Sequence, residues 1–103
     1  MRAFLLIGAL AAAVSTRAAA QDGKALYLAN CKKCHGETGK PSDAIKKMNP
    51  KIETFDAAFF ASRTDAQLAK GIAEGKGKMK PLKDKLTPEE LKAVATYIRT
   101  LKP

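Results

Sequence analysis

Cys31-Lys32-Lys33-Cys34-His35 is the stretch that decides the fold, and it holds both cysteines and the only histidine of the 103-residue chain. On a helix, Cys31 and Cys34 would lie three residues apart and share one face. Both sulfurs could then form thioether bonds with the two vinyl groups of one porphyrin. The adjacent His35 could place an imidazole nitrogen on the iron. The C-x-x-C-H spacing therefore predicts covalent attachment of a haem.

Three other kinds of site use cysteines at similar spacing. A structural zinc site needs about four Cys or His ligands, and this chain supplies three. A thioredoxin-like redox site normally lies near a βαβ pattern, and we find no convincing strand pattern in the sequence. A structural disulfide would leave unexplained why the sole histidine follows the second cysteine. Haem attachment accounts for all three residues.

The first twenty residues resemble a secretory signal peptide. Arg2 gives a basic start, residues 3–14 form an apolar run too short to span a bilayer, and Ala18-Ala19-Ala20 fits an A-x-A cleavage site. We expect cleavage before Gln21, which makes residues 1–20 the signal and residues 21–103 the exported domain. An uncleaved amphipathic anchor is the alternative. Export predicts a periplasmic location, with no stable insertion in a membrane.

The exported part is expected to be one small, basic domain. The whole chain has a formal net charge of +9, and its first twenty residues carry two arginines and no acid, so the domain keeps +7. A chain this short struggles to build a sufficient apolar core alone, and we expect the haem to complete it. Export argues against nucleic acid as the partner of this charge. An acidic protein or an anionic membrane surface fits better, and a generally cationic surface without a dedicated partner is the alternative.

Helical patterns run through the domain and predict an all-α fold of about four helices. The first would be capped by Asp22 and lead into the cysteine motif. A short helix over residues 57–61 would be capped by Asp56. A third would open at Thr64 with a T-x-x-Q capping box and stop at Gly75. The segment between the first two helices, residues 37–54, is polar and contains proline, with Met48 and Ile52 expected to point inward.

The last helix has the strongest start signal, Thr87-Pro88-Glu89-Glu90, a capping box with proline at the first helical position. Its apolar stripe consists of Leu91, Val94, Ala95, Ile98 and Leu101. A stripe at this spacing must be buried against another element. The first helix is the expected partner, with Gly23 allowing an aromatic side chain such as Tyr97 to approach closely.

A second protein ligand would fill the sixth coordination position of the haem iron and suit it to electron transfer. With one protein ligand, that position would stay open to small molecules. Methionine is the natural choice in a chain with one histidine, and Met48 and Met79 are the candidates in the exported domain. Met79 is favoured, because two glycines precede it and Pro81 follows. Met48 and an open iron remain alternatives. We also expect a backbone carbonyl in residues 41–50 to orient the ring of His35.

The sequence resembles the small class I c-type cytochromes, specifically the single-haem bacterial periplasmic proteins of the c6 and c551 kind. The resemblance covers residues 22–103. It rests on Tyr27 and the cysteine motif, on Gly77-Lys78-Met79-Lys80-Pro81, on Met48-Asn49-Pro50-Lys51-Ile52, and on the closing helix with Tyr97. Many relatives have proline or an apolar residue where Lys80 stands.

This resemblance implies an all-α cytochrome c fold that wraps one covalent haem c with its iron. Cys31 and Cys34 would form the thioether links, and His35 and Met79 would be the axial ligands. The family implies a soluble, monomeric electron carrier rather than an enzyme, and a haem-based sensor or peroxidase-like module with an open iron is the alternative. Lysines around the haem edge would steer an acidic redox partner. They are Lys32, Lys33, Lys76, Lys78, Lys80, Lys83 and Lys85.

Overall fold

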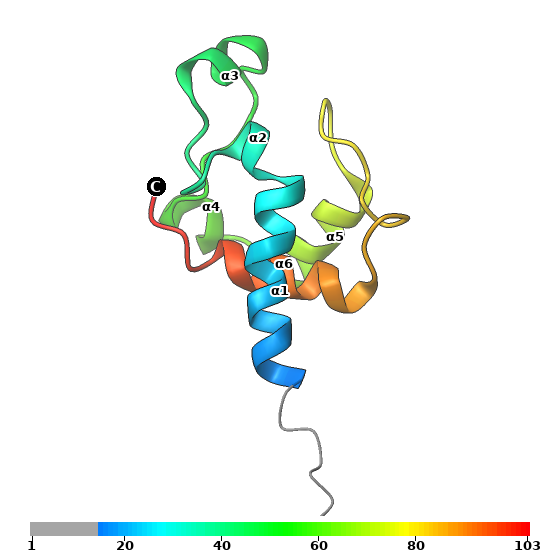
Figure 1. The fold of residues 1–103 in the computed structure, drawn as a ribbon. Helices are drawn as coiled ribbons and strands as arrows, with labels where there is room; N and C mark the ends of the chain where they lie inside the picture. Colours follow the sequence, from blue (N-terminus) through cyan, green and yellow to red (C-terminus); the bar gives the residue numbers. More distant parts are fainter. Residues whose placement is uncertain (1–14) are drawn as a thin grey trace, which may run out of the picture.

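The computed structural model describes the backbone of residues 15–103 and the side chains from Gly23 onward. This part of the chain forms six α-helices and no strand (Figure 1). They are α1 (Ser15–Asn30), α2 (Lys32–His35), α3 (Asp43–Met48), α4 (Ala57–Ala61), α5 (Asp65–Glu74) and α6 (Pro88–Ile98). The predicted all-α class is confirmed.

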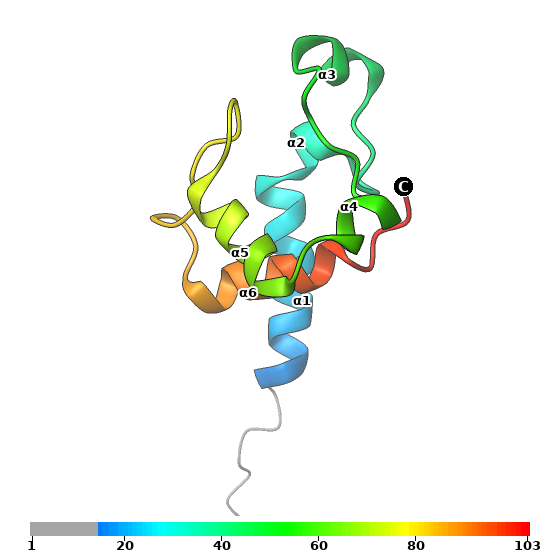
Figure 2. The ribbon, with the colours of Figure 1, turned by 180° about the vertical axis from the view of Figure 1, so that it is seen from behind.

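The frame of the fold is the crossing of α1 and α6, which Figures 1 and 2 show from opposite sides. A Cβ atom built on Gly23 would lie 2.6 Å from the carbonyl oxygen of Ala93 and 3.3 Å from Cβ of Tyr97. The predicted packing role of Gly23 is therefore confirmed, although the backbone of α6 approaches it more closely than the aromatic side chain does. Tyr27 and Val94 are fully buried at this crossing.

The sequence signals at the starts of α4, α5 and α6 are confirmed. Asp56 accepts a hydrogen bond from the backbone N–H of Phe59 at 2.9 Å. Thr64 and Thr87 each form a complete capping box, with Gln67 and Glu90 as the third helical residues. These caps satisfy backbone groups that a helix end leaves without a partner, so the three helices begin where the sequence predicted.

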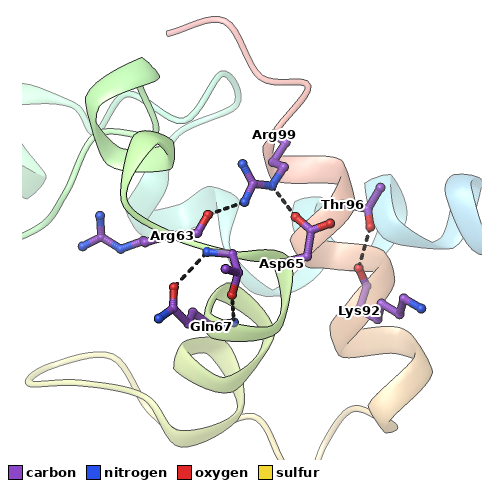
Figure 3. A network of polar contacts seen from close by, with 7 residues as sticks. Arg63, Asp65, Gln67, Lys92, Thr96 and Arg99 are labelled. Carbon is purple, nitrogen blue, oxygen red and sulfur yellow. Dashed lines mark hydrogen bonds and ion pairs between the residues drawn. The ribbon is translucent and has the colours of Figure 1, made fainter.

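The C-terminal end of α6 is tied to the start of α5 by polar contacts (Figure 3). Arg99 pairs with the carboxylate of Asp65 and donates a hydrogen bond to the carbonyl oxygen of Arg63 at 2.6 Å. These contacts fix α5 against α6.

Three local features differ from the sequence-based expectations. The first helix begins at Ser15, so Asp22 lies inside α1 and does not cap it in the full chain. Residues 43–48 form α3, where a segment without a helix was expected, because Ser42 caps it by accepting a hydrogen bond from the N–H of Ile45. The prediction that Met48 points inward is wrong: its side chain is 68% exposed at the end of α3.

The predicted signal peptide lies largely outside the described residues, which begin at Ser15. Its cleavage point before Gln21 falls within α1. Cleavage at Gln21 stays a prediction.

Candidate haem site

The cysteine motif lies at the end of α1 and forms α2, almost as a continuation of the same helix. Cys31, with φ of −122°, separates α1 from α2. Helical hydrogen bonds nevertheless continue on both sides of Cys31. The N–H of Cys31 donates to the carbonyl of Tyr27 at 2.8 Å, and the N–H of His35 donates to that of Cys31 at 2.9 Å. The helical geometry expected for Cys31–His35 is therefore present.

The two cysteines are unpaired thiols in different surroundings. Cys31 is 8% exposed and belongs to the core, whereas Cys34 is exposed. Burial, with a smaller contribution from Cys34, raises the pKa of the Cys31 thiol to about 11. The structure thus shows no disulfide between them. The sulfur of Cys31 lies in the core and that of Cys34 is exposed. This arrangement suits attachment to a group that is only partly enclosed by the protein.

His35 stacks on the buried ring of Phe55, with ring centroids 4.6 Å apart and an interplanar angle of 20°. Its Nδ1 atom is buried and makes no hydrogen bond within the described part of the chain. Burial lowers the pKa of the imidazole, and the backbone and carboxylate of Glu53 partly offset this. A half-buried neutral imidazole with a buried, unpartnered ring nitrogen is well suited to ligate a metal.

The expectation that a carbonyl in residues 41–50 orients His35 stays a prediction, because Nδ1 of the imidazole has no hydrogen-bond partner in the described part of the chain. The segment of residues 41–50 contains α3, which projects away from α2 (Figures 1 and 2). The chain returns beside the imidazole only at Glu53 and Phe55. The backbone next to His35 is therefore the return segment after α3, which the sequence analysis did not single out.

Tyr27 fixes the end of the motif from inside the core. Its side chain is fully buried, and its hydroxyl donates a hydrogen bond to the carbonyl of Gly36, directly after His35, at 2.7 Å. Burial raises the pKa of this hydroxyl, so it stays protonated and remains a donor. The sequence signal for this role was the position of Tyr27 one helical turn before Cys31.

Met79 lies in a tight hairpin between α5 and α6. Lys76 and Met79 exchange two backbone hydrogen bonds, at 3.1 and 3.0 Å. Gly77 turns the chain between them with φ of +59°, a conformation that glycine adopts without strain. The N–H of Leu82 donates to the carbonyl of Ala73 at 3.1 Å and holds the base of the loop against α5.

The surroundings of the two methionines separate them as ligand candidates. The side chain of Met79 is partly buried and packs against the core, whereas that of Met48 is largely exposed. The hairpin that carries Met79 projects on the same side of the α1–α6 crossing as α2 (Figures 1 and 2). The fold therefore places Met79, rather than Met48, in apolar surroundings.

Residues 18–98 match a protein family described as cytochrome c oxidase, cbb3-type, subunit III. The chain belongs to this family. The match spans most of the chain and includes the cysteine motif and Met79. Together with the structural relatives below, it makes the chain a class I c-type cytochrome with a single haem.

Two kinds of relative support this assignment. The cytochrome is 31% identical over 84 residues to the cbb3-type cytochrome c oxidase subunit FixP of Azorhizobium caulinodans; the match covers 81% of this chain and 27% of FixP. It is 40% identical to the solved KustC0563 c-type cytochrome, with a TM-score of 0.70 over 80% of this chain and 99% of that one. A mutant of that protein gives a TM-score of 0.68 at the same identity, over 79% and 99% of the two chains. The chain thus spans about a quarter of FixP.

The family carries covalently bound haem c with iron, and so does this cytochrome. Its residues fit that group, since the fold supplies two free thiols, a half-buried imidazole with a buried, unpartnered nitrogen, and a partly buried thioether. The described residues contain no cluster of three His, Cys, Asp or Glu side chains able to hold another metal. None of the described helices is long and apolar enough to cross a membrane.

Proposed function

We propose that this cytochrome is an exported one-electron carrier whose haem is attached at Cys31 and Cys34 and ligated by His35 and Met79. The observation that carries this proposal is the contrast between the two methionines. Met79 is partly buried in a hairpin held by hydrogen bonds, and Met48 is exposed. A haem with two protein ligands cycles between ferric and ferrous iron without binding a substrate.

The protein around the haem would favour the reduced state. A thioether is a soft ligand that stabilises the softer ferrous iron, and His/Met ligation raises the reduction potential of a haem. Apolar side chains near the two proposed ligands act in the same direction, because they disfavour the additional positive charge of ferric iron. Phe55 stacks on His35, and Met79 packs against the core.

A second role has support from the family match. The cytochrome resembles part of FixP, a subunit of a cbb3-type cytochrome c oxidase. This chain could pass electrons within an oxidase assembly rather than between freely diffusing partners. Both roles use the same closed haem. Stable co-purification with an oxidase from native membranes would favour the second role, and recovery from the periplasmic fraction as a monomer would favour the first.

An absorption spectrum of the purified holoprotein tests the closed haem. We expect the ferric form to show a weak far-red charge-transfer band from sulfur to iron, and the ferrous form to bind carbon monoxide poorly. Both results follow from a thioether in the sixth position. A high-spin spectrum with rapid carbon monoxide binding would contradict the carrier proposal and favour a sensor or peroxidase-like module.

The lysines near the site supply the proposed docking surface for an acidic partner. All of the following are exposed in the structure: Lys32, Lys33, Lys76, Lys78, Lys80, Lys83 and Lys85. They lie on α2 and in the segment between α5 and α6 that carries Met79. Positive charge close to the site from which the electron leaves raises the rate at which the protein meets a negatively charged partner.

We expect electron transfer to an anionic oxidant such as ferricyanide to slow several-fold between about 0.01 M and 1 M salt, as the Debye length falls from ~30 Å to ~3 Å. Changing Lys76 and Lys80 together to glutamate should remove most of this salt dependence. The matched control changes Lys24 and Lys92, exposed on α1 and α6, and alters net charge equally. Equal effects of the two double variants on stopped-flow rates would mean that net charge, rather than this surface, governs encounter.

A further inference from the structure

The hairpin that carries Met79 is joined to the end of α3 by one side chain. The ammonium group of Lys78 donates a hydrogen bond to the backbone carbonyl of Met48, thirty positions earlier in the chain. Lys78 directly precedes Met79 in the turn closed by Lys76 and Met79. Its hydrogen bond therefore acts on the backbone next to the proposed ligand.

The partner of Lys78 is a carbonyl that accepts readily. Met48 is the last residue of α3, and the final carbonyls of a helix have no partner within it. The N–H of Ile52, which would bond Met48 in a longer helix, instead donates to Asn49 at 3.0 Å. A lysine near the C-terminal end of a helix also has a favourable interaction with the helix dipole.

Apolar packing between helices does little to hold these two segments together. In the described part of the chain, helix packing is concentrated in α1 against α6 and in α5 against α6, with α2 following α1. No described helix packs extensively against α3, which forms a projection separate from the hairpin (Figures 1 and 2). A single polar bridge therefore has more influence on their relative position than it would inside a packed core.

We propose that Lys78 is a positioning residue, which holds the Met79 hairpin toward α3 and so slows the departure of the Met79 thioether from the haem iron. The proposal rests on the His/Met ligation proposed above. Lys78 itself stays off the iron and acts through the backbone of the turn. Without its hydrogen bond, the described backbone hydrogen bonds that hold the hairpin to α5 are those at its base, from Leu82 and Lys83, and the packing of Met79 against the core remains. The tip of the hairpin is then freer to swing outward.

Imidazole tests this proposal, because it binds ferric haem only when the methionine ligand leaves. In the holoprotein, Lys78→Met removes the donor and keeps most of the side-chain length. We expect it to bind imidazole about five-fold more tightly than wild type, the size expected for one exposed charge-assisted hydrogen bond. Lys78→Arg should restore most of the wild-type affinity, since arginine keeps a cationic donor.

The matched control is Lys51→Met, which removes the same charge from an exposed lysine on the segment after α3. We expect its imidazole affinity to stay within about two-fold of wild type, as an unbridged surface charge has little effect. If Lys78→Met and Lys51→Met bind imidazole equally well and the wild type has the far-red band, the proposed role of Lys78 is overturned. The proposed ligation by Met79 then stands. A wild-type protein without that band would overturn both this role and the proposed ligation by Met79.

Discussion

Replacement of Met79 by alanine is expected to open the sixth position of the haem iron. The variant should lose the far-red sulfur-to-iron band, bind carbon monoxide readily when reduced, and have a reduction potential lower by on the order of 0.1 V. Axial ligands set haem potentials over a range of ~0.8 V, and loss of the soft thioether removes a ligand that favours ferrous iron. Absorption spectroscopy and a redox titration of the holoprotein measure all three effects.

Met48→Ala is the matched control for that variant. It removes the same kind of side chain from an exposed position at the end of α3, so the far-red band and the potential should stay close to wild type. If instead Met48→Ala lost the band and Met79→Ala kept it, the ligand assignment would be reversed. Retention of the band in both single variants would exclude either methionine as the sole sulfur ligand.

The second large effect is expected from Gly23, where α1 and α6 cross. An alanine Cβ there would lie 2.6 Å from the carbonyl oxygen of Ala93, and a backbone atom cannot move aside as a flexible side chain can. The helices must separate, so Gly23→Ala should lower the free energy of unfolding by about 1–3 kcal/mol, the usual size for overpacking. Guanidinium unfolding of the ferric holoprotein measures this change.

Gly71 provides the control, because it also lies inside a helix, α5, and a Cβ built on it meets no atom within 4 Å. Gly71→Ala should therefore gain the intrinsic helix preference of alanine and raise stability by about 0.5–1 kcal/mol. Opposite signs for the two substitutions identify close helix packing at Gly23. Stabilisation by both would show that α1 and α6 adjust at the crossing without cost.

Local sequence signals predicted most of the framework of this fold. The caps at Asp56, Thr64 and Thr87 and the stripe on α6 depend on residues within a few positions of one another, so their patterns can be read directly. The packing role of Gly23 could also be predicted, because the apolar stripe of the last helix must pack against another element and a glycine allows a close approach. The cysteine motif predicted the cofactor because its chemistry, too, is contained in neighbouring residues, the five from Cys31 to His35.

Features formed by residues distant in sequence could not be predicted in this way. The position of His35 depends on Phe55, which stacks on its ring, and on the return segment near Glu53. Met48 was expected to point inward because it is apolar, but α3 projects away from the core and leaves it exposed. The hydrogen bonds from Arg99 to Arg63 and from Lys78 to Met48 likewise join segments that show no shared pattern.

The crossing of α1 with α6 also affects the order in which the chain can mature. Because residues 31–87 separate α1 from α6, the buried surface around Tyr27 and Val94 cannot form until α6 has been made. Closing so long a loop is entropically costly and slows the final step of folding. The cysteine motif emerges much earlier and is therefore accessible in an open chain. Thioether formation can precede the meeting of the two helices, so the order of synthesis favours attachment first and folding second.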